Sequence, residues 1–440
     1  MLFSQALSLT VIAPPVAQVR SWILKGGAAV IEQALFAGGN FVMNVALARS
    51  LPAADYGAFA FTYTILISLT AVHNAFILEP ATVLETSRYT SHLRAYCRAQ
   101  LVLHTAFTAC LAAILVAAGM VVSRVGWTSG LGSALMSAGI GCPTILLFWL
   151  TRRFMYLLTR SLTAMDGSAL YFGIICAGLV VATGLYELSP FVGFLIMGAA
   201  SAVGALFMLA LVARQASSAA ESAIPFTMRT LIWERWRYGR WLLAKVCLET
   251  AHAPAVTFIV TATLGLAAVG TLRAMQVFMV PITHTMTALS SLALPMLARD
   301  FEAGKLGTLR TKSHVLTALV VALALGVELI LALFHGGLEQ HLYMGKYASA
   351  SSLIPVFGVA ALFEGTAASY GILLSAVRQP RLLLLSSALS APLALGVSLV
   401  CIQAWGVYGA ALSFVVTQAL ATIIRHRLAR PWLLASDRSG

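Results

Sequence analysis

Long apolar segments recur along the whole chain, separated by short polar or basic stretches. A helix needs about 20 apolar residues to cross the hydrocarbon core of a bilayer, so these segments predict an all-α polytopic membrane protein with about twelve transmembrane helices. The expected helices cover residues 23–48, 56–79, 99–122, 131–150, 165–186, 189–213, 241–263, 268–297, 313–335, 350–376, 382–404 and 406–426.

The composition supports this prediction and excludes other classes. Hydrophobic residues make up 60% of the 440 residues and charged residues only 10%, whereas soluble domains carry about 45–50% and about 25%. A soluble enzyme, a disordered chain and a fibrous protein are therefore excluded. The six cysteines are scattered, and no P-loop, zinc-protease or serine-hydrolase motif occurs. We expect no enzymatic activity, no metal site and no bound cofactor.

The basic residues predict the orientation. Most of the 28 Lys and Arg residues fall in alternate loops between the expected helices. Positive charge resists translocation, so these loops are expected on the cytoplasmic side, together with both termini. The net charge of +13 then forms a basic collar that faces anionic lipid, and nucleic acid is not an expected partner.

The two halves of the chain resemble each other. Matching positions lie between 213 residues (Gly57 and Gly270) and 219 residues (Trp22 and Trp241) apart. Such repeats predict two pseudo-symmetric six-helix lobes, related by an axis along the membrane normal, with a binding site at their interface. The expected organisation is a lead-in (1–22), an N-lobe (23–214), a cytoplasmic linker (215–240), a C-lobe (241–427) and a cytoplasmic tail (428–440).

The linker ends in a basic and aromatic stretch, residues 232–241, with the sequence IWERWRYGRW. This pattern is typical of a helix that lies in the inner membrane interface. The alternative is a regulatory or partner-binding element.

Six short motifs, in order along nearly the whole chain, resemble a known family. They are Leu47–Gly57 (LARSLPAADYG), Leu266–Gly270 (LAAVG), Ala293–Ala298 (ALPMLA), Tyr343–Tyr347 (YMGKY), Leu373–Ala376 (LLSA) and Gly406–Leu412 (GVYGAAL). The chain resembles the polysaccharide (O-antigen or exopolysaccharide) flippases of the multidrug/oligosaccharidyl-lipid/polysaccharide exporter superfamily.

That resemblance implies a V-shaped pair of lobes around a central cavity lined by the first, second, seventh and eighth helices. It also implies flipping of an undecaprenyl-pyrophosphate-linked oligosaccharide across the bacterial inner membrane, for O-antigen, lipopolysaccharide or exopolysaccharide assembly. The implied partners are that lipid-linked oligosaccharide, membrane lipids and a glycan polymerase or export machinery. Drug exporters share the fold, and the glycan stays open.

Polar residues within the expected helices are candidates for substrate binding, because a charge in mid-bilayer is costly. Arginine suits a pyrophosphate since its planar fork binds two oxygens at once, and amides suit sugar hydroxyls. The candidates are Arg273, Lys25, Asn40, Asn44, Gln276 and Asn74. Simpler alternatives stay open. Lys25 can reach the interface by snorkelling, the amides can hold helices together, and Arg273 can anchor to lipid headgroups.

A second set consists of titratable residues that could couple transport to an H⁺ or Na⁺ gradient. Glu32 and Glu249 occupy roughly matching places in the two repeats, while His252 and His284 lie on the seventh and eighth helices. A lone histidine is more often a packing residue. Glu328 and Glu364 are expected inside a lobe, away from the cavity, in structural hydrogen bonds.

The sequence thus favours a flippase that works by alternating access of the two lobes. Two rivals stay open: a multidrug or cation antiporter on the same fold, and a membrane partner of a glycan polymerase that does not itself transport.

Overall fold

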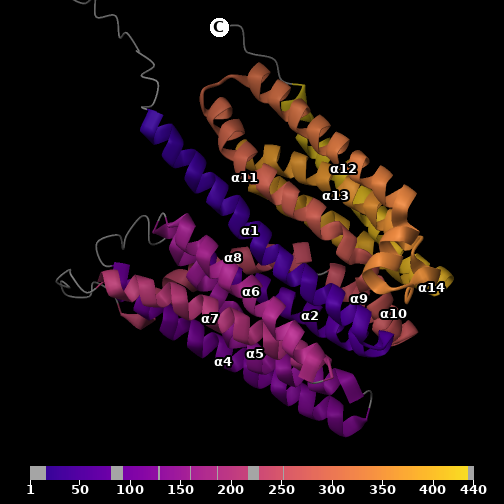
Figure 1. Cartoon of the computed structure of the whole chain (residues 1–440). Coiled ribbons are helices and arrows are strands. Elements are labelled where there is room, and N and C mark those ends of the chain that lie inside the picture. The colour runs from indigo at the N-terminus through magenta and orange to yellow at the C-terminus, as the bar shows by residue number, and fades with distance from the viewer. Residues whose placement is uncertain are drawn as a thin grey trace, which may run out of the picture.

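The computed structural model describes residues 16–80, 93–126, 129–158, 160–185, 187–216, 227–250 and 252–434. Within these ranges the backbone forms helices and short turns, with no strand. The helices are arranged in two lobes (Figure 1), so the chain is an all-α polytopic membrane protein, as its sequence predicts.

The described residues of the N-lobe form six helices. All six are long and apolar enough to cross a membrane, and the second ends in a π-helical turn, η1 (Asn74–Leu78). The helices are α1 (Val16–Ser50), α2 (Ala53–His73), α4 (Leu93–Val125), α5 (Ser129–Leu157), α6 (Ser161–Leu185) and α7 (Pro190–Ala216).

The C-lobe begins with two groups of helical segments. The first consists of α8 (Met228–Thr250) and α9 (His252–Leu264). The second consists of α10 (Leu266–Gln276), the 3-10 turn η4 (Val277–Met279) and α11 (Val280–Glu302). The interruption at η4 precedes Pro281, which has no N–H to continue the helical hydrogen bonds.

The rest of the C-lobe is formed by α12 (Leu306–Tyr343), the short turn η5 (Ala348–Ala350), α13 (Leu353–Ala376) and α14 (Pro380–Leu433). Gly406 adopts φ 57° inside the 54-residue α14 and divides it into two membrane-length arms. A left-handed φ favours glycine, which has no Cβ. The cut expected between residues 404 and 406 is therefore present as a kink.

The structure differs from the sequence expectation at several helix ends. The fourth helix was expected to stop at residue 150, but α5 continues to Leu157. The seventh was expected to begin at residue 241, whereas α8 begins at Met228 and crosses that position without a break. The basic and aromatic stretch is thus continuous with the seventh helix.

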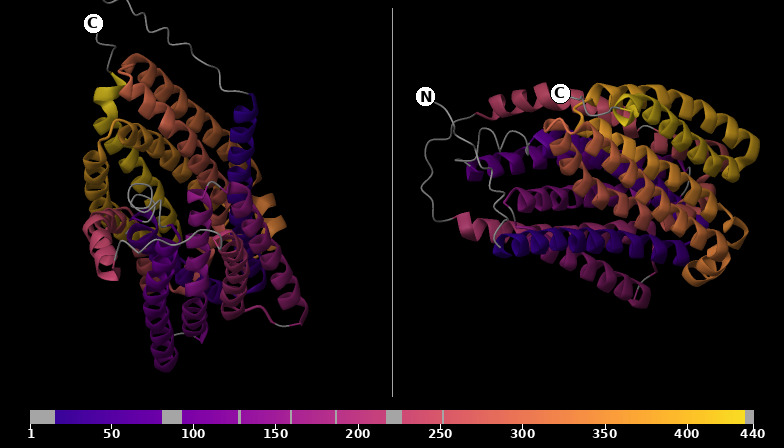
Figure 2. Two further views of the ribbon diagram at one scale, coloured as in Figure 1. Left: turned by 90° about the vertical axis from the view of Figure 1, so that its left-hand side faces the viewer. Right: turned by 90° about the horizontal axis from the view of Figure 1, so that it is seen from above.

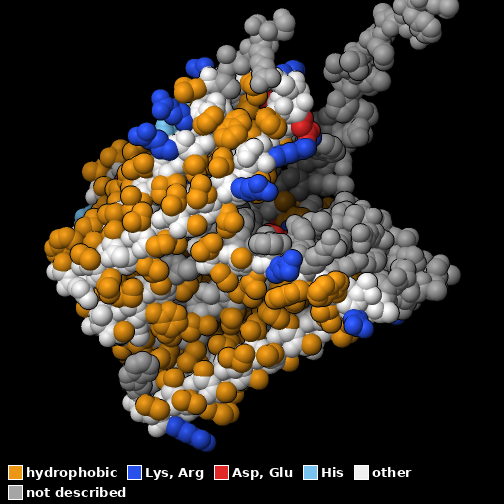
Figure 3. Space-filling model, turned by 180° about the vertical axis from the view of Figure 1, so that it is seen from behind, with side chains coloured by type: hydrophobic (Ala, Val, Ile, Leu, Met, Phe, Trp, Pro, Cys, Tyr) orange, Lys and Arg blue, Asp and Glu red, His pale blue; other side chains and the backbone are white. Residues whose placement is uncertain are grey.

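Small residues let helices approach closely, as is usual in membrane proteins. A methyl group at Gly198 would lie 3.0 Å from the Cα of Gly141, where α7 crosses α5. The described part of the face seen in Figure 3 is largely hydrophobic, as expected of a surface that faces lipid.

The two lobes form a V. They meet near α2, α9 and α10 and diverge toward the end where α1 begins and α11 ends (Figure 1). The start of α1 and the end of α14 lie at that same end of the molecule (Figure 2). We call it the open end, and the end where the lobes meet the closed end.

Candidate functional site: a cavity between the lobes

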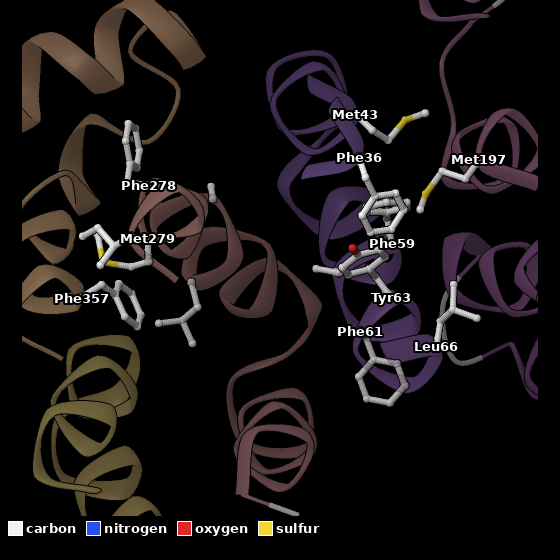
Figure 4. Close-up of a cluster of buried hydrophobic side chains, with 14 of the residues drawn as sticks. Phe36, Met43, Phe59, Phe61, Tyr63, Leu66, Met197, Phe278, Met279 and Phe357 are labelled. Atoms are coloured by element: carbon white, nitrogen blue, oxygen red, sulfur yellow. The ribbon is translucent and has the colours of Figure 1, made fainter. Parts of the chain in front are cut away.

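A cavity of about 590 Å³ lies between the lobes. Its aromatic and apolar wall comes from both of them: Phe36, Tyr63, Leu66 and Met197 from the N-lobe, Met279 and Phe357 from the C-lobe (Figure 4). Its described lining holds two charged side chains, Arg273 and Glu364. The polar residues that line it are Asn40, Asn44, Thr64, Ser68, Thr70, Ser201, Thr257, Gln276, Thr283 and Gln418.

Arg273 of α10 reaches across from the C-lobe to the N-lobe. Its Nε lies 3.4 Å from Oδ1 of Asn44 on α1, and its guanidinium carbon lies 5.1 Å from the centre of the Tyr63 ring on α2. The ring face attracts the cation. Arg273 therefore lines the cavity between the lobes, and the alternative of an anchor in the lipid headgroups does not describe its position.

Asn40 and Asn44 line the same cavity, but their amides are already engaged. Each Nδ2 donates to a carbonyl oxygen one turn earlier in α1, at 2.9 Å and 2.8 Å. Oδ1 of Asn40 accepts from Tyr171 at 3.2 Å and Tyr63 at 3.5 Å, and Oδ1 of Asn44 accepts from Tyr56 at 3.3 Å. These two residues both line the cavity and hold helices together.

The structure brings four of the six substrate-binding candidates together: Arg273, Asn40, Asn44 and Gln276. Asn74 is not part of the described lining; it lies on the π-helical turn, where its Nδ2 is 3.5 Å from Oε1 of Glu79. The side chains of Lys25, Glu249, His252 and His284 lie outside the described part of the structure.

Glu32 lies inside the N-lobe, 1% exposed, and is fully engaged there. Arg152 of α5 pairs with it, with Nε 2.5 Å from Oε1 and Nη2 3.0 Å from Oε2. Tyr156 and Ser168 donate to the same carboxylate at 2.7 Å and 2.6 Å. The Arg152 guanidinium also stacks over the Phe36 ring at 4.3 Å.

This network differs from the sequence expectation for Arg152. The expected helix ends at residue 150, which places Arg152 in a basic cytoplasmic loop. Arg152 is only 6% exposed, because α5 continues past residue 150 for about two more turns and places Arg152 beside Glu32. A buried cation of this kind needs a partner, and Glu32 provides it.

Glu364 also corrects an expectation. It was expected inside a lobe, yet it lines the cavity from α13, as Gln418 does from α14. The sequence contained a signal for it, since an ionisable residue in an apolar helix indicates a functional site by default. Glu328 is packed inside the C-lobe against α13 at Gly358, where a methyl group would collide with its carboxylate.

The closed end is formed by backbone contacts between the lobes. A methyl group at Gly57 of α2 would collide with the carbonyl of Leu266, and one at Gly270 of α10 would collide with the carbonyl of Ala53. Only glycine allows the two helices to cross this closely. The two glycines are matching positions of the internal repeat, so the repeat places the same feature on each side of the contact.

A lysine from the C-lobe completes the closed end. Nζ of Lys346, in the turn after α12, donates to the carbonyls of Ala48, at 2.8 Å, and Leu51. The Tyr347 hydroxyl donates to Ala48 O at 3.3 Å. These carbonyls lie at the C-terminal end of α1, where helical carbonyls lack intrahelical partners and carry negative partial charge. The C-lobe therefore caps a helix of the N-lobe.

No protein-family model and no curated protein matches the sequence. Solved structures match over almost the whole chain. An inward-facing multidrug resistance MATE family transporter of the MOP superfamily is 12% identical with a TM-score of 0.71, covering 92% of this chain and 98% of its own. The lipid II flippase MurJ, in an inward closed conformation, is 10% identical with a TM-score of 0.71, covering 93% and 87%.

A third match is the Vibrio cholerae MATE transporter VcmN, 11% identical with a TM-score of 0.62, covering 96% of this chain and 98% of its own. The chain has the same fold as these three proteins. At this level of identity the likeness establishes the architecture, and the site residues have to be argued from their own geometry.

Proposed function

We propose that this protein flips a lipid-linked oligosaccharide of the undecaprenyl-pyrophosphate type across the bacterial cytoplasmic membrane. The observation that carries the proposal is Arg273, a cation inside a cavity between two lobes. Moving a pyrophosphate and its sugars through hydrocarbon strips their hydration at a prohibitive cost. A guanidinium can replace part of that hydration with two parallel hydrogen bonds.

The rest of the cavity suits the sugar part of such a substrate. Tyr63, Trp149 and Phe36 supply flat apolar faces, while Gln276 and the hydroxyls of the lining supply hydrogen bonds. The lipid tail would stay in the bilayer, so the cavity has to shelter only the polar head.

The two ends of the molecule suit alternating access. The lobes are held together at the closed end by α2, α10 and Lys346, and they diverge toward the end that carries the termini. With the termini in the cytoplasm, as the basic loops predict, this conformation receives substrate from the cytoplasmic side. Transport then requires the contacts at the closed end to break and new ones to form at the open end.

We propose an H⁺ or Na⁺ gradient as the driving force, with Glu32, Glu249, His252 and His284 as the candidate coupling residues. Of these, Glu32 has a described environment. Protonation of its carboxylate, or Na⁺ binding to it, would weaken its pairing with Arg152, which lies against the cavity residue Phe36. Full gradient-driven transport by both Glu32→Gln and Glu249→Gln would remove this part of the proposal.

A multidrug or cation antiporter is the second candidate, and Glu364 is the observation that favours it. A carboxylate beside aromatic rings in a membrane cavity suits an organic cation. This candidate predicts that Glu364→Gln abolishes transport while Arg273→Gln has little effect. The flippase predicts the reverse order of sensitivity.

The test is transport by the purified protein in liposomes. A fluorescent, NBD-labelled polyprenyl-diphosphate disaccharide is placed in both leaflets, and dithionite quenches the outer one. The flippase predicts a protein-dependent loss of the inner pool under an imposed ion gradient. Transport of ethidium, with no movement of the glycolipid, would instead establish the antiporter.

A further inference from the structure

A second cavity, of about 490 Å³, lies within the C-lobe. It lies between the last turns of α13 and the two arms of α14, and Leu248 of α8 and Leu294 of α11 border it. Phe414 and Gln418 line both this cavity and the one between the lobes, so the two cavities are adjacent.

The described lining of the C-lobe cavity contains one charged side chain, Arg425. The carboxylate of Glu364, which interacts electrostatically with Arg425, lines the cavity between the lobes instead. Hydroxyl groups surround the same space, from Ser375, Ser387, Ser390 and Thr417. Arg425 lies in the last part of α14, where further basic residues, Arg427 and Arg430, follow it. The charge and the hydroxyls together make this cavity suited to an anion.

Arg425 is held in place by the adjacent helix. Its Nη1 lies 3.4 Å from the carbonyl oxygen of Ala367 on α13. Gly371, one turn further along α13, lies beside the guanidinium. A methyl group at Gly371 would be in van der Waals contact with Nη1 of Arg425, at 3.6 Å. Ala368 is also small and lines the cavity.

Arg425 therefore holds α14 against α13 while its guanidinium borders the cavity. The observed volume is much larger than one water molecule, whose share of liquid volume is about 30 Å³. A guanidinium beside such a volume has room for a ligand with several oxygens.

We propose that the C-lobe cavity binds a phosphate-bearing group, with Arg425 as its principal ligand. The hydroxyls of Ser387 and Thr417 are nearby donors, and that of Ser387 would turn from the Leu383 carbonyl oxygen, 3.2 Å away, toward the ligand. Arginine matches phosphate geometry with two parallel hydrogen bonds. Two sources share this chemistry: the headgroup phosphate of an anionic membrane lipid, and the diphosphate of the transported substrate. The second source rests on the proposed function.

The site is tested by protection of a cysteine placed in its wall. Ser390→Cys is introduced after the six natural cysteines are replaced by alanine, and its labelling by a maleimide is followed in nanodiscs. Farnesyl diphosphate is the first probe and phosphatidylglycerol in the nanodisc is the second, with phosphatidylcholine nanodiscs as the reference. We expect one of the two probes to slow labelling at least tenfold.

Arg425→Gln should remove that protection. Arg427 is exposed and lies two residues further along α14, so Arg427→Gln should retain the protection. Arg425→Lys keeps the charge and should retain part of the protection. Protection by farnesyl diphosphate assigns the site to a diphosphate, and protection by phosphatidylglycerol alone assigns it to a lipid headgroup. Failure of both probes in the Ser390→Cys protein, or equal protection in Arg425→Gln, would overturn the proposal.

This readout is independent of transport. Arg273→Ala should stop flipping and leave the protection of Ser390→Cys unchanged. If the parent protein flips the glycolipid normally but neither probe protects Ser390→Cys, the C-lobe site alone is ruled out. If a probe protects Ser390→Cys but the parent protein does not flip the glycolipid, the proposed function alone is ruled out.

Discussion

Glu32 and Arg152 show how single residues at the edge of the cavity are constrained. The pair is buried in the N-lobe and reinforced by two hydroxyl donors. A buried ion pair stabilises a protein less than its geometry suggests, because both charges have lost their water, but removing one partner leaves the other uncompensated. Substitutions in the pair can therefore distinguish its contribution to stability from a role in ion coupling.

We predict that Glu32→Gln and Arg152→Met each lower the stability of the detergent-solubilised protein by about 3–5 kcal/mol. The double variant should be much less affected than the sum of the two, because no buried charge is left unpaired. Thermal unfolding of the four proteins gives the coupling energy. Additive effects in this cycle would contradict the direct pairing.

The position of Arg152 could not be read from the sequence. It follows an apolar run and precedes Arg153, which is the usual pattern of a cytoplasmic loop, and its partner Glu32 lies 120 residues away. Arg273 could be predicted because it interrupts an apolar segment by itself. Glu364 also interrupts an apolar segment by itself. Its helix is not among the four that the family resemblance implies as cavity lining, so Glu364 was expected inside a lobe.

At the scale of helices, the closed end depends on one close crossing and one cap. The crossing of α2 and α10 requires glycine at positions 57 and 270. The cap is Lys346, which bonds the last carbonyls of α1 from the opposite lobe. Both features lie between the lobes. We therefore expect them to affect the equilibrium between the closed and the separated state of this end more than the folding of either lobe.

Lys346→Met should weaken the closed end. A hydrogen bond from a charged donor contributes about 1.5–3 kcal/mol when buried, and the exposed position of this lysine reduces that to about 1 kcal/mol, or roughly a fivefold shift toward the separated state. Spin labels at Ser50→Cys and Ser349→Cys report the distance across the closed end. An unchanged distance distribution in Lys346→Met would contradict the capping role, and Lys346→Arg is the matched control.

Gly57→Ala should force α2 and α10 apart, because the added methyl meets a backbone carbonyl that cannot rotate away. Overpacking of this kind costs about 1–3 kcal/mol. The same spin labels should show a longer distance. Gly173→Ala on α6 is the matched control, because its new methyl group meets no atom within 4 Å, and it should leave the distance distribution unchanged. If Gly57→Ala and Gly173→Ala give the same distance distribution, the crossing of α2 and α10 does not control closure.

The existence and order of the helices could be predicted, since apolar length alone determines which segments can cross a membrane. The kink at Gly406 was expected as a short break between two helices. Helix ends were predicted less well. The extension of α5 depends on a distant ion pair, and the start of α8 depends on contacts such as that of Arg235 with Tyr96, at 3.2 Å, and with Ile77.

At the scale of the whole molecule, the internal repeat explains why the cavity lies where it does. Two similar lobes meet at matching glycines and diverge toward the termini, and the space between them collects polar residues from both. The sequence predicted this interface as the site. It did not predict that the described lining carries one cation and one carboxylate, because that depends on how α13 packs against the cavity.

The proposed flipping activity depends most on Arg273, and the role of this residue can be measured as the flipping rate of the NBD-labelled polyprenyl-diphosphate disaccharide in liposomes. We predict that Arg273→Ala lowers the rate at least a hundredfold, because a bidentate guanidinium–phosphate contact contributes about 3 kcal/mol in a water-poor site. Arg124→Ala, at an exposed position near the end of α4, should flip at the normal rate. Normal flipping by correctly folded Arg273→Ala would show that Arg273 does not bind the diphosphate.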